Sequence, residues 1–300
     1  MTPIRESRLD LAGRRTRALE VGSDVATEIV GPPVVLLHGW SDSADTWRRL
    51  LATLGARGRR AIALDMPGFG VAAALADETP ILPQLDAFAA AAIERESALA
   101  DGRPVVVAGN SLGGAVAMRV AERDELPIGG IVPIAPAGLS MAGWFRIIEG
   151  ERLLRLLLAS PFPLPELVVR EAVGRVYRTL AFADPRLVEP AIVAAFTRHV
   201  RTQADVARVL AAGRRLLPEL SEPFRLDRIR CPVLLVWGDS DRMVFAAGAE
   251  WVLRAVSGAR IEVIEGCGHC PQIEATERLV ALLEEFADEV VPSAGLVRGT

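Results

Sequence analysis

The sequence contains no lysine and no surplus of positive charge. All 34 of its basic residues are arginines, they face 38 acidic residues, and the formal net charge is −4. A chain without a basic surplus lacks the electrostatic footprint of a nucleic-acid-binding protein. We therefore expect no nucleic-acid partner.

Long hydrophobic runs are absent as well. No stretch of about 18 apolar residues is free of charges, which predicts that no helix spans a membrane. The first residues, "MTPIRESRLDLAGRR", carry charges where a secretory signal needs an apolar run. These absences predict a cytoplasmic protein without a membrane partner.

Cysteine is scarce. Cys231, Cys267 and Cys270 are too few for a closed disulfide framework, which a chain of 300 residues does not need. The last two have the C-x-x-C spacing of thiol–disulfide exchange proteins, but that motif follows an early strand in a domain of about 100 residues. Here it lies near the end of the chain. We predict that both thiols are bystanders; a thiol switch that disables the neighbouring His269 is the alternative.

Continuous apolar runs dominate what is present. Runs of Val, Ile and Leu predict strands buried on both faces of a parallel sheet. They occupy residues 32–39, 59–70, 103–111, 128–138, 231–241 and 259–269, and residues 14–22 and 24–31 read as short edge strands. Helical patterns occupy residues 44–58, 82–102, 112–126 and 276–290. Strands that alternate with helices predict an α/β fold with right-handed crossovers.

The alternation stops near residue 139. From residue 140 to 220 the pattern is helical, and Asp184-Pro185 has the cap and first-turn residues that begin a helix. The sequence thus predicts an α/β core formed by residues 1–139 and 221–300, with residues 140–220 as an inserted helical lid.

A serine follows one of the predicted strands in the pattern G-x-S-x-G. Residues 109–113 read "GNSLG", with an apolar run before them and an Ala-rich helical pattern after them. This context is typical of a nucleophile elbow, a sharp turn that lifts Ser111 above the sheet at a helix N-terminus. A serine hydroxyl needs a base and, behind the base, an orienting carboxylate.

Three histidines compete for the role of base. His38 lies in a Gly-containing turn and His199 in the helical insert, whereas His269 ends the last predicted strand. We therefore predict that His269 is the base. "WGDSD" offers Asp239 and Asp241 as the carboxylate, in the chain order Ser, Asp, His of α/β-hydrolases.

Five motifs together resemble the α/β-hydrolase fold family with a helical lid. They are "HGW" (38–40), "DMPGFG" (65–70), "GNSLGG" (109–114), "WGDSD" (237–241) and "GHCPQIE" (268–274). The resemblance implies a mostly parallel sheet flanked by helices, and a catalytic triad of Ser111, Asp241 and His269. It also implies that the backbone N–H groups of Trp40 and Leu112 form the oxyanion hole.

Two details of the resemblance concern its loops. It leaves Asp65 to hold its own loop rather than take part in the chemistry. The serine that such proteins usually carry after the D-x-P-G-x-G loop is replaced by Val71-Ala72-Ala73, so no role transfers to that stretch.

Ser111 narrows the reaction. Epoxide hydrolases and haloalkane dehalogenases of this fold carry Asp at that position, which leaves acyl transfer to water and favours a serine esterase of small carboxylic esters. Carbon–carbon hydrolases of ring-cleavage products are an alternative, because Asn110 resembles their G-N-S elbow. Their Gly-rich oxyanion loop and the aromatic residue after the histidine are missing here, where Cys270 stands. Cofactor-free haloperoxidases and low-turnover ligand receptors of the same fold also stay open.

The predicted pocket and partners complete the sequence-based reading. Trp144, Phe145, Phe182 and Val244 are candidate pocket residues. The lid carries 12 arginines against 8 acidic residues, a balance that fits anionic substrates or simply solvated helix faces. We expect a small-molecule substrate, no cofactor, no metal because no second Cys/His pair has ligand spacing, and a monomer or homodimer.

Overall fold

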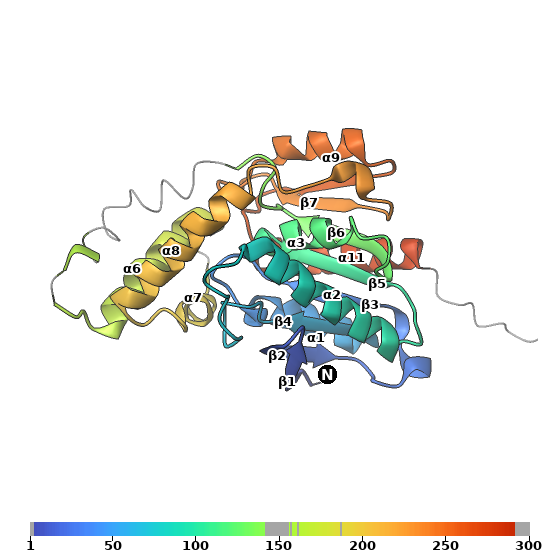
Figure 1. Ribbon diagram of the computed structural model, residues 1–300, viewed down its shortest axis with the longest axis horizontal. Helices are drawn as coiled ribbons and strands as arrows, with labels where there is room; N and C mark the ends of the chain where they lie inside the picture. The colour runs from blue at the N-terminus through green and yellow to red at the C-terminus, as the bar shows by residue number, and fades with distance from the viewer. Residues whose placement is uncertain (1–2, 142–155, 157, 161, 187, 292–300) are drawn as a thin grey trace, which may run out of the picture.

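A central eight-stranded sheet organises the molecule (Figure 1). The computed structural model describes residues 3–141, 156, 158–160, 162–186 and 188–291. The strand order is β1-β2-β4-β3-β5-β6-β7-β8. The strands are β1 (Arg5–Leu11), β2 (Arg14–Val21), β3 (Val30–Leu37), β4 (Arg59–Leu64), β5 (Val105–Asn110), β6 (Ile128–Ile134), β7 (Leu234–Gly238) and β8 (Arg260–Ile264).

Six of the strands run parallel, and the two at one edge do not. β1 pairs with β2, and β2 with β4, in antiparallel register, whereas β4, β3, β5, β6, β7 and β8 are parallel. β3 lies between β4 and β5, so the chain passes from β3 to β4 on one side of β3 and then to β5 on the other side. Ligands of open α/β sheets bind at such a reversal of strand order, outside the carboxyl ends of the strands.

Helices cover both faces of the sheet. On one face α2 (Ile81–Leu99), α3 (Leu112–Val120) and α9 (Ala249–Ala255) contribute to one hydrophobic cluster. On the other face α1 (Arg48–Ala56) and α11 (Thr276–Val290) contribute to a second. Side chains that alternate along the central strands β3, β5, β6 and β7 enter these two clusters in turn, which is why those strands are largely apolar.

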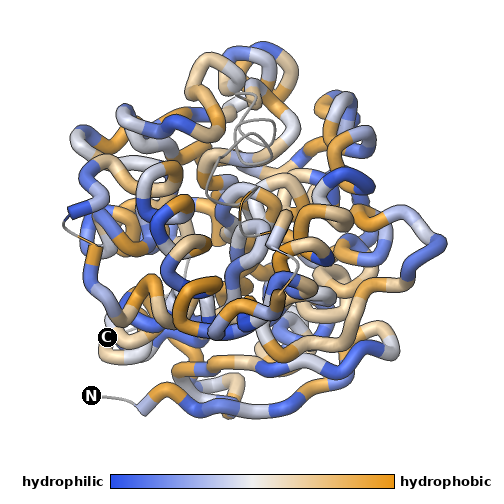
Figure 2. The backbone as a smooth tube through the Cα atoms, turned by 90° about the vertical axis from the view of Figure 1, so that its left-hand side faces the viewer, coloured by the Kyte–Doolittle hydropathy of each residue, from blue (hydrophilic) through white to orange (hydrophobic). Residues whose placement is uncertain are grey.

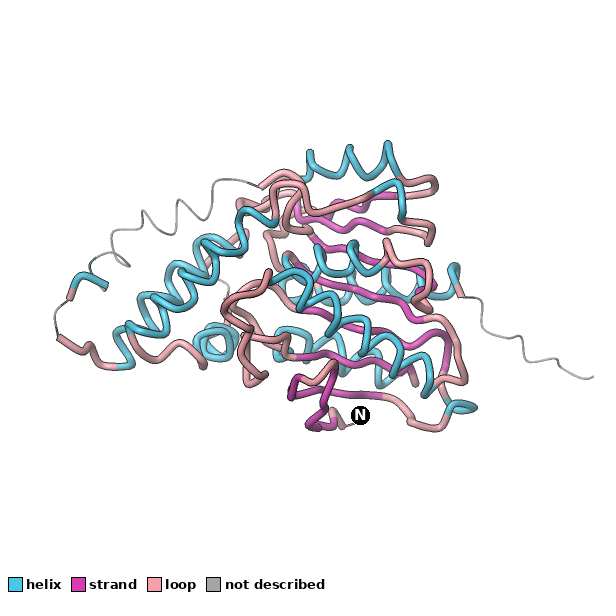
Figure 3. The backbone as a smooth tube through the Cα atoms, in the orientation of Figure 1, coloured by secondary structure: helices cyan, strands magenta, loops and turns pink. Residues whose placement is uncertain are grey.

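Three helices extend beyond the carboxyl ends of the strands. They are α6 (Glu166–Ala181), α7 (Pro190–Thr197) and α8 (Gln203–Glu219). The loops that follow the strands lie between these helices and the sheet (Figure 3). Figure 2 looks onto this side, where orange and blue alternate along the helical turns, as in amphipathic helices. Along α8 the buried residues recur on one face: Val206, Leu210, Gly213 and Leu216.

These observations confirm the predicted fold class. The chain forms an α/β-hydrolase fold, with a mostly parallel sheet flanked by helices and a helical insertion between β6 and β7. The pocket candidates Trp144 and Phe145 lie outside the described residues, and so does most of the segment 151–160.

Two local predictions were wrong. Residues 24–31 do not form an edge strand: Ala26–Glu28 is a single 3₁₀ turn and β3 begins at Val30. At that edge of the sheet, beside β2, the outermost strand is β1. Both faces of β1 are largely exposed and carry charged residues, so its sequence shows no apolar alternation. Asp184 does not cap a helix, because its carboxylate accepts the Arg186 N–H in a local turn at 3.0 Å and α7 begins at Pro190.

Candidate active site

Ser111 stands at a strained turn between β5 and α3. Its φ of 53° and ψ of −111° are rare for a residue with a side chain, and its N–H donates to the Ile134 carbonyl at 2.8 Å. The turn requires close backbone approach. A Cβ at Gly109 or at Gly113 would lie 2.2 Å from a backbone oxygen, that of Gly113 or of Leu37 respectively. The predicted elbow is therefore present as a conformation.

The helix after the elbow points its N-terminus at the same place. Leu112 is the first residue of α3, so its N–H has no acceptor within the helix. Trp40 follows the end of β3, the neighbouring parallel strand. Trp40, Ser111 and Leu112 border one small pocket with residues of α8. The two residues predicted for the oxyanion hole thus flank the serine.

His269 is paired with Asp241. The distance from Nδ1 of His269 to Oδ2 of Asp241 is 2.7 Å, and both side chains are buried. The other oxygen of Asp241 accepts the N–H groups of Met243 at 2.7 Å and Val244 at 3.1 Å. Because the carboxylate only accepts, Nδ1 carries the proton and Nε2 is left with its lone pair.

The second imidazole nitrogen is unoccupied. Nε2 of His269 is buried and has no hydrogen-bond partner among the described residues. Both His269 and Ser111 line the same cavity. Asp239, the alternative carboxylate, is exposed, and its side chain accepts a hydrogen bond from Ser240 instead. The structure therefore pairs Asp241, and not Asp239, with the histidine.

The histidine loop is held by the lid and by the elbow. The N–H of His269 donates to the Ala181 carbonyl at 2.8 Å, and its own carbonyl accepts Nδ2 of Asn110 at 2.8 Å. Glu274, in the short helix α10 (Pro271–Glu274), accepts the N–H groups of Gly268 and Ala183. The glutamate of the G-H-x-P-x-x-E motif thus joins this loop to the end of α6.

A cavity with an empty volume of about 910 Å³, its mouth included, opens above these residues. Its wall is apolar on the lid side and polar on the core side. The lining residues are Gly39, Trp40, Ser41, Asp42, Asn110, Ser111, Val173, Val176, Tyr177, Leu180, Ala181, Phe196, Val200, Val206, Val209, Leu210, Met243, His269 and Cys270.

The lining differs from the predicted pocket. Phe182 and Val244 are buried but do not line the cavity; their neighbours in space, Tyr177 and Met243, do. Sequence alone does not reveal which of two adjacent residues at the end of a helix or loop turns inward. Among the described residues no arginine lines the cavity, although the lid is rich in arginine.

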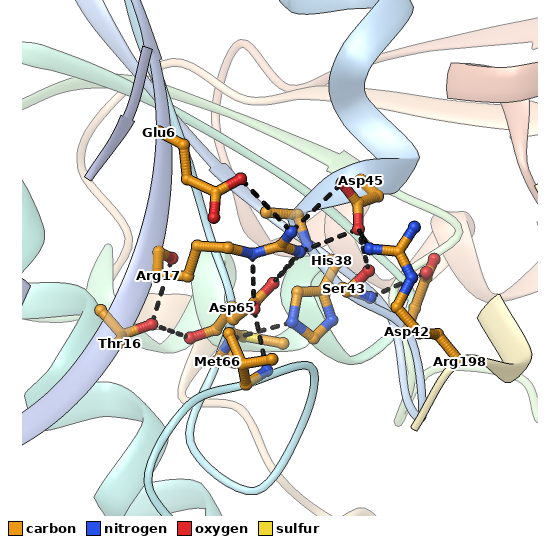
Figure 4. Close-up of polar contacts among 12 residues, drawn as sticks. Glu6, Thr16, Arg17, His38, Asp42, Ser43, Asp45, Asp65, Met66 and Arg198 are labelled. Carbon is orange, nitrogen blue, oxygen red and sulfur yellow. Dashed lines mark hydrogen bonds and ion pairs between the residues drawn. The ribbon is translucent and has the colours of Figure 1, made fainter. Parts of the chain in front are cut away.

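His38 and Asp65 belong to the framework below the cavity (Figure 4). Nδ1 of His38 donates to the Gly39 carbonyl at 2.7 Å and Nε2 accepts the Met66 N–H at 2.9 Å, so both ring nitrogens are used. Burial lowers the pKa of His38 to about 4 and keeps it neutral. Asp65 accepts the N–H of Val71 at 2.9 Å, as its predicted role in holding its own loop requires.

Arg17 joins two acidic residues beneath the loop after β3. Its guanidinium donates to Asp65 at 3.0 and 3.1 Å and to Asp45 at 2.9 Å (Figure 4). Asp65 also accepts the N–H of Ala44 at 2.8 Å. Burial acts to raise the pKa of Asp45, but hydrogen bonds from Arg17 and Arg48 lower it overall. This network fixes the loop that carries Trp40.

Asp42 lies in the same loop, but its surroundings are different. It is 6% exposed, it lines the cavity, and it accepts the N–H of Ser43 at 2.8 Å. Burial raises its pKa to about 7. This residue was not among the sequence-predicted site residues, because an acidic residue in a loop gives no sign of burial.

The cysteines lie close to the histidine. Cys267 and Cys270 are free and buried, and Cys270 lines the cavity. Burial raises the pKa of both thiols. Thiols with raised pKa values form little thiolate and are poor nucleophiles.

Among the described residues, no group of three or more His, Cys, Asp or Glu side chains is arranged to hold a metal ion. Within the same part of the chain, no helix combines the length and the apolar character needed to cross a membrane.

A family model described as "Alpha/beta hydrolase family" matches residues 34–282. The chain belongs to this family. It is 28% identical over 260 residues to a pimeloyl-(acyl-carrier protein) methyl ester esterase of Nitrosomonas europaea, which covers 85% of the chain and 95% of the relative. It is 25% identical over 262 residues to the monoacylglycerol lipase abhd6-A of Xenopus laevis, at coverages of 84% and 74%.

Solved structures of other family members share the fold. The structure of 2-hydroxy-6-oxo-6-phenylhexa-2,4-dienoate hydrolase from Rhodococcus sp. strain RHA1 superposes with a TM-score of 0.72 at 23% identity, covering 95% of this chain and 99% of that one. At that identity the likeness concerns the fold alone. The sequence relatives named here are thus an esterase and a lipase, and proteins that share the fold include this dienoate hydrolase.

Proposed function

We propose that this protein is a serine hydrolase that cleaves small carboxylic esters through an acyl-enzyme. The observation that carries the proposal is the arrangement around His269. One imidazole nitrogen is bound to Asp241 at 2.7 Å, the other has no partner among the described residues, and both His269 and Ser111 line one cavity. A hydroxyl at a strained elbow beside a neutral, oriented imidazole is what nucleophilic catalysis needs.

In the proposed reaction, Oγ of Ser111 attacks the ester carbonyl while Nε2 of His269 takes the hydroxyl proton. Asp241 stabilises the imidazolium that forms. The intermediate collapses, and His269 gives the proton to the leaving alcohol. Water then attacks the acyl-serine with His269 again as base, which releases the carboxylic acid and restores Ser111.

The negative charge of each tetrahedral intermediate needs hydrogen-bond donors. The N–H groups of Leu112 and Trp40 are proposed for this role, because they flank Ser111 at the start of α3 and after β3. Removing one such donor from an oxyanion hole typically costs about 10²–10³ in kcat. The positive end of α3 adds to this stabilisation.

The relatives support an ester substrate. An esterase of acyl-carrier-protein methyl esters and a monoacylglycerol lipase match this chain over most of its length. Apolar residues of the lid, among them Val173, Val206 and Leu210, line the cavity and fit the hydrocarbon part of a small ester.

A panel of p-nitrophenyl esters of increasing acyl length tests the proposal. Purified protein should release p-nitrophenol without added metal or cofactor, and Ser111→Ala should lower kcat/KM by at least ~10³-fold. An unreactive variant must first be shown to fold, by its thermal unfolding. Absence of any Ser111-dependent turnover across the panel would favour a ligand receptor of the same fold.

Carbon–carbon hydrolysis is the second candidate, favoured by Asn110 before the serine. The side chain of Asn110 lines the cavity, but its Nδ2 donates to the His269 carbonyl and its Oδ1 accepts Nε2 of Gln272 at 3.2 Å. Both ends of the amide are therefore used by the protein. A ring-cleavage dienoate assayed beside the esters separates the two candidates by the ratio of their kcat/KM values.

A further inference from the structure

The cavity contains one buried acid that no arginine neutralises. Asp42 is 6% exposed and lines the wall, and among the described residues no arginine lies within ion-pair distance of it. Other buried acids of the chain are paired: Asp65 with Arg17, and Glu20 and Glu96 with Arg60. A buried carboxylate without a counter-charge is costly, so its retention in a cavity wall indicates a ligand that supplies the charge.

Within the part of the chain that the structure describes, the groups around Asp42 offer no positively charged partner. Its carboxylate accepts hydrogen bonds from the Ser43 N–H and the Thr46 hydroxyl, both uncharged. On the same wall lie Tyr177 from α6 and Cys270, whose side chains approach each other at 4.0 Å. These groups are polar and uncharged, so none of them neutralises the carboxylate.

We propose that Asp42 binds a protonated amine of the substrate, so that the cavity selects esters bearing an ammonium group over plain aliphatic esters of equal length. The inference rests on the proposed esterase function and names its substrate class. The ammonium group donates to the Asp42 carboxylate, while the apolar part of the ester packs against the lid residues.

An ammonium group fits this corner better than other polar groups. It supplies the missing positive charge, so its hydrogen bond joins two opposite charges, whereas a hydroxyl donates to the carboxylate without offsetting its charge. A substrate carboxylate would instead meet a second negative charge, and no arginine of the described residues is in the lining to offset it. The described arginines of the lid therefore do not make this cavity a site for anions.

Matched esters test the proposal. One series is methyl hexanoate and its analogues in which the terminal methyl group is replaced by hydroxyl or by ammonium. A second series makes the same replacements in the alcohol part of pentyl acetate. For each series, kcat/KM is measured by the acid released, and the ratio of the ammonium ester to the methyl-terminated ester is formed within each variant.

In at least one series we expect a wild-type ratio of about 10 or more, and a ratio below 1 for Asp42→Asn and Asp42→Leu. Asp42→Asn keeps the acceptor for the Ser43 N–H, so it separates charge from folding. Asp77→Asn is the matched control, because Asp77 is 99% exposed and its loss changes the net charge equally. This control should leave the ratio unchanged.

Three outcomes would overturn the inference. They are equal ratios in wild type and Asp42→Asn, a hydroxyl ester preferred as strongly as the ammonium ester, and the same loss of ratio in Asp77→Asn. If no ester is hydrolysed in a Ser111-dependent manner, the proposed esterase function fails instead. Calorimetry with hexylammonium, hexanol and hexanoate then still tests the site: only hexylammonium should bind, and Asp42→Asn should abolish its binding.

Discussion

Asp42 and Asp45 lie three residues apart in one loop, yet their surroundings are opposite. Burial acts to raise the pKa of both carboxyl groups. Asp45 contacts Arg17 and Arg48, and its pKa is lowered overall. Asp42 contacts no arginine of the described ranges, and its pKa is raised to about 7. One acid is a structural anchor under the loop, and the other faces the cavity.

The comparison extends to two other acids near the carboxyl ends of the strands. Asp65 is fully buried and paired with Arg17, whereas Asp241 is buried and paired with His269. Acids that meet arginine hold backbone in place, because guanidinium stays protonated at every accessible pH. Asp241 and Asp42 have no arginine partner among the described residues; Asp241 contacts the histidine and Asp42 lines the cavity. Among these four acids, an arginine partner thus separates the framework of the site from the groups proposed to act in it.

The largest effect should come from the acid beside the histidine. Asp241→Asn removes the acceptor that fixes the imidazole tautomer, so kcat for ester hydrolysis should fall by about 10⁴-fold. Asp239→Asn is the control on the same loop and should stay within about 3-fold, because its side chain is exposed. The reverse ranking would show that the roles of the two acids are misassigned.

Arg17→Met should have the next largest effect, on stability. The change leaves the fully buried Asp65 without its arginine and leaves Asp45 with the partly exposed Arg48 and Arg198. Breaking a buried pair typically costs about 3–5 kcal/mol. Urea unfolding measures the loss. Arg186→Met, at an exposed pair with Asp184, should leave the free energy of unfolding essentially unchanged. Equal losses in the two variants would contradict the distinction between framework and surface arginines.

Asp42→Asn should show a pH-dependent gain in stability. The folded-state pKa is raised from 3.8 to about 7, so the stability contributed by neutral Asp42 is present below pH ~4 and lost as pH rises through ~7. Asparagine does not ionise. The variant should match wild type at pH ~3.5, where Asp42 is protonated in both states, and unfold with about 2–4 kcal/mol more free energy at pH ~8.5.

Asp45→Asn sharpens this comparison, because its pKa shift has the opposite sign. The pKa of Asp45 is lowered, so the stability it contributes is present above pH ~4 and lost as pH falls below that value. Asp45→Asn should therefore be less stable than wild type at pH ~8.5. A destabilisation of both variants at that pH would refute the assignment of Asp42 as an acid without a counter-charge.

The smallest effect should come from the cysteines. Changing Cys267 and Cys270 together to Ala should leave ester hydrolysis within ~10-fold of wild type, a barrier change below about 1.4 kcal/mol. Their thiols have raised pKa values and serve as packing beside His269. Reductant should leave the rate unchanged. Activity that stops on mild oxidation and returns with dithiol would reveal a switch.

Much of the fold could be predicted from local patterns. Apolar runs identified the six parallel strands, because strands buried on both faces carry few polar residues. β8 departs from that expectation: it lies at an edge of the sheet, and its residues are exposed or half-buried. β1 was not predicted, because an exposed edge strand carries charges on both faces. The helix start at Pro190 was not predicted, because Asp184-Pro185 has the same local pattern. Only packing against α6 and the core decides which of the two prolines begins a helix.

The proposed nucleophile, base and acid came from motif and order, since an elbow needs glycines and a base must follow a strand. The sequence by itself determined which chemistry is available: Ser111, His269 and a nearby aspartate are set by residue type and by their places after strands. Tertiary structure decided which aspartate meets the histidine, which lid residues turn into the cavity, and which loop acid meets an arginine. Burial and counter-charge arise between segments far apart in the chain, as Arg17 from β2 beside Asp45 and Asp65 shows. The local sequence does not predict such pairs. Only the distance to an arginine side chain distinguishes Asp42 from Asp45.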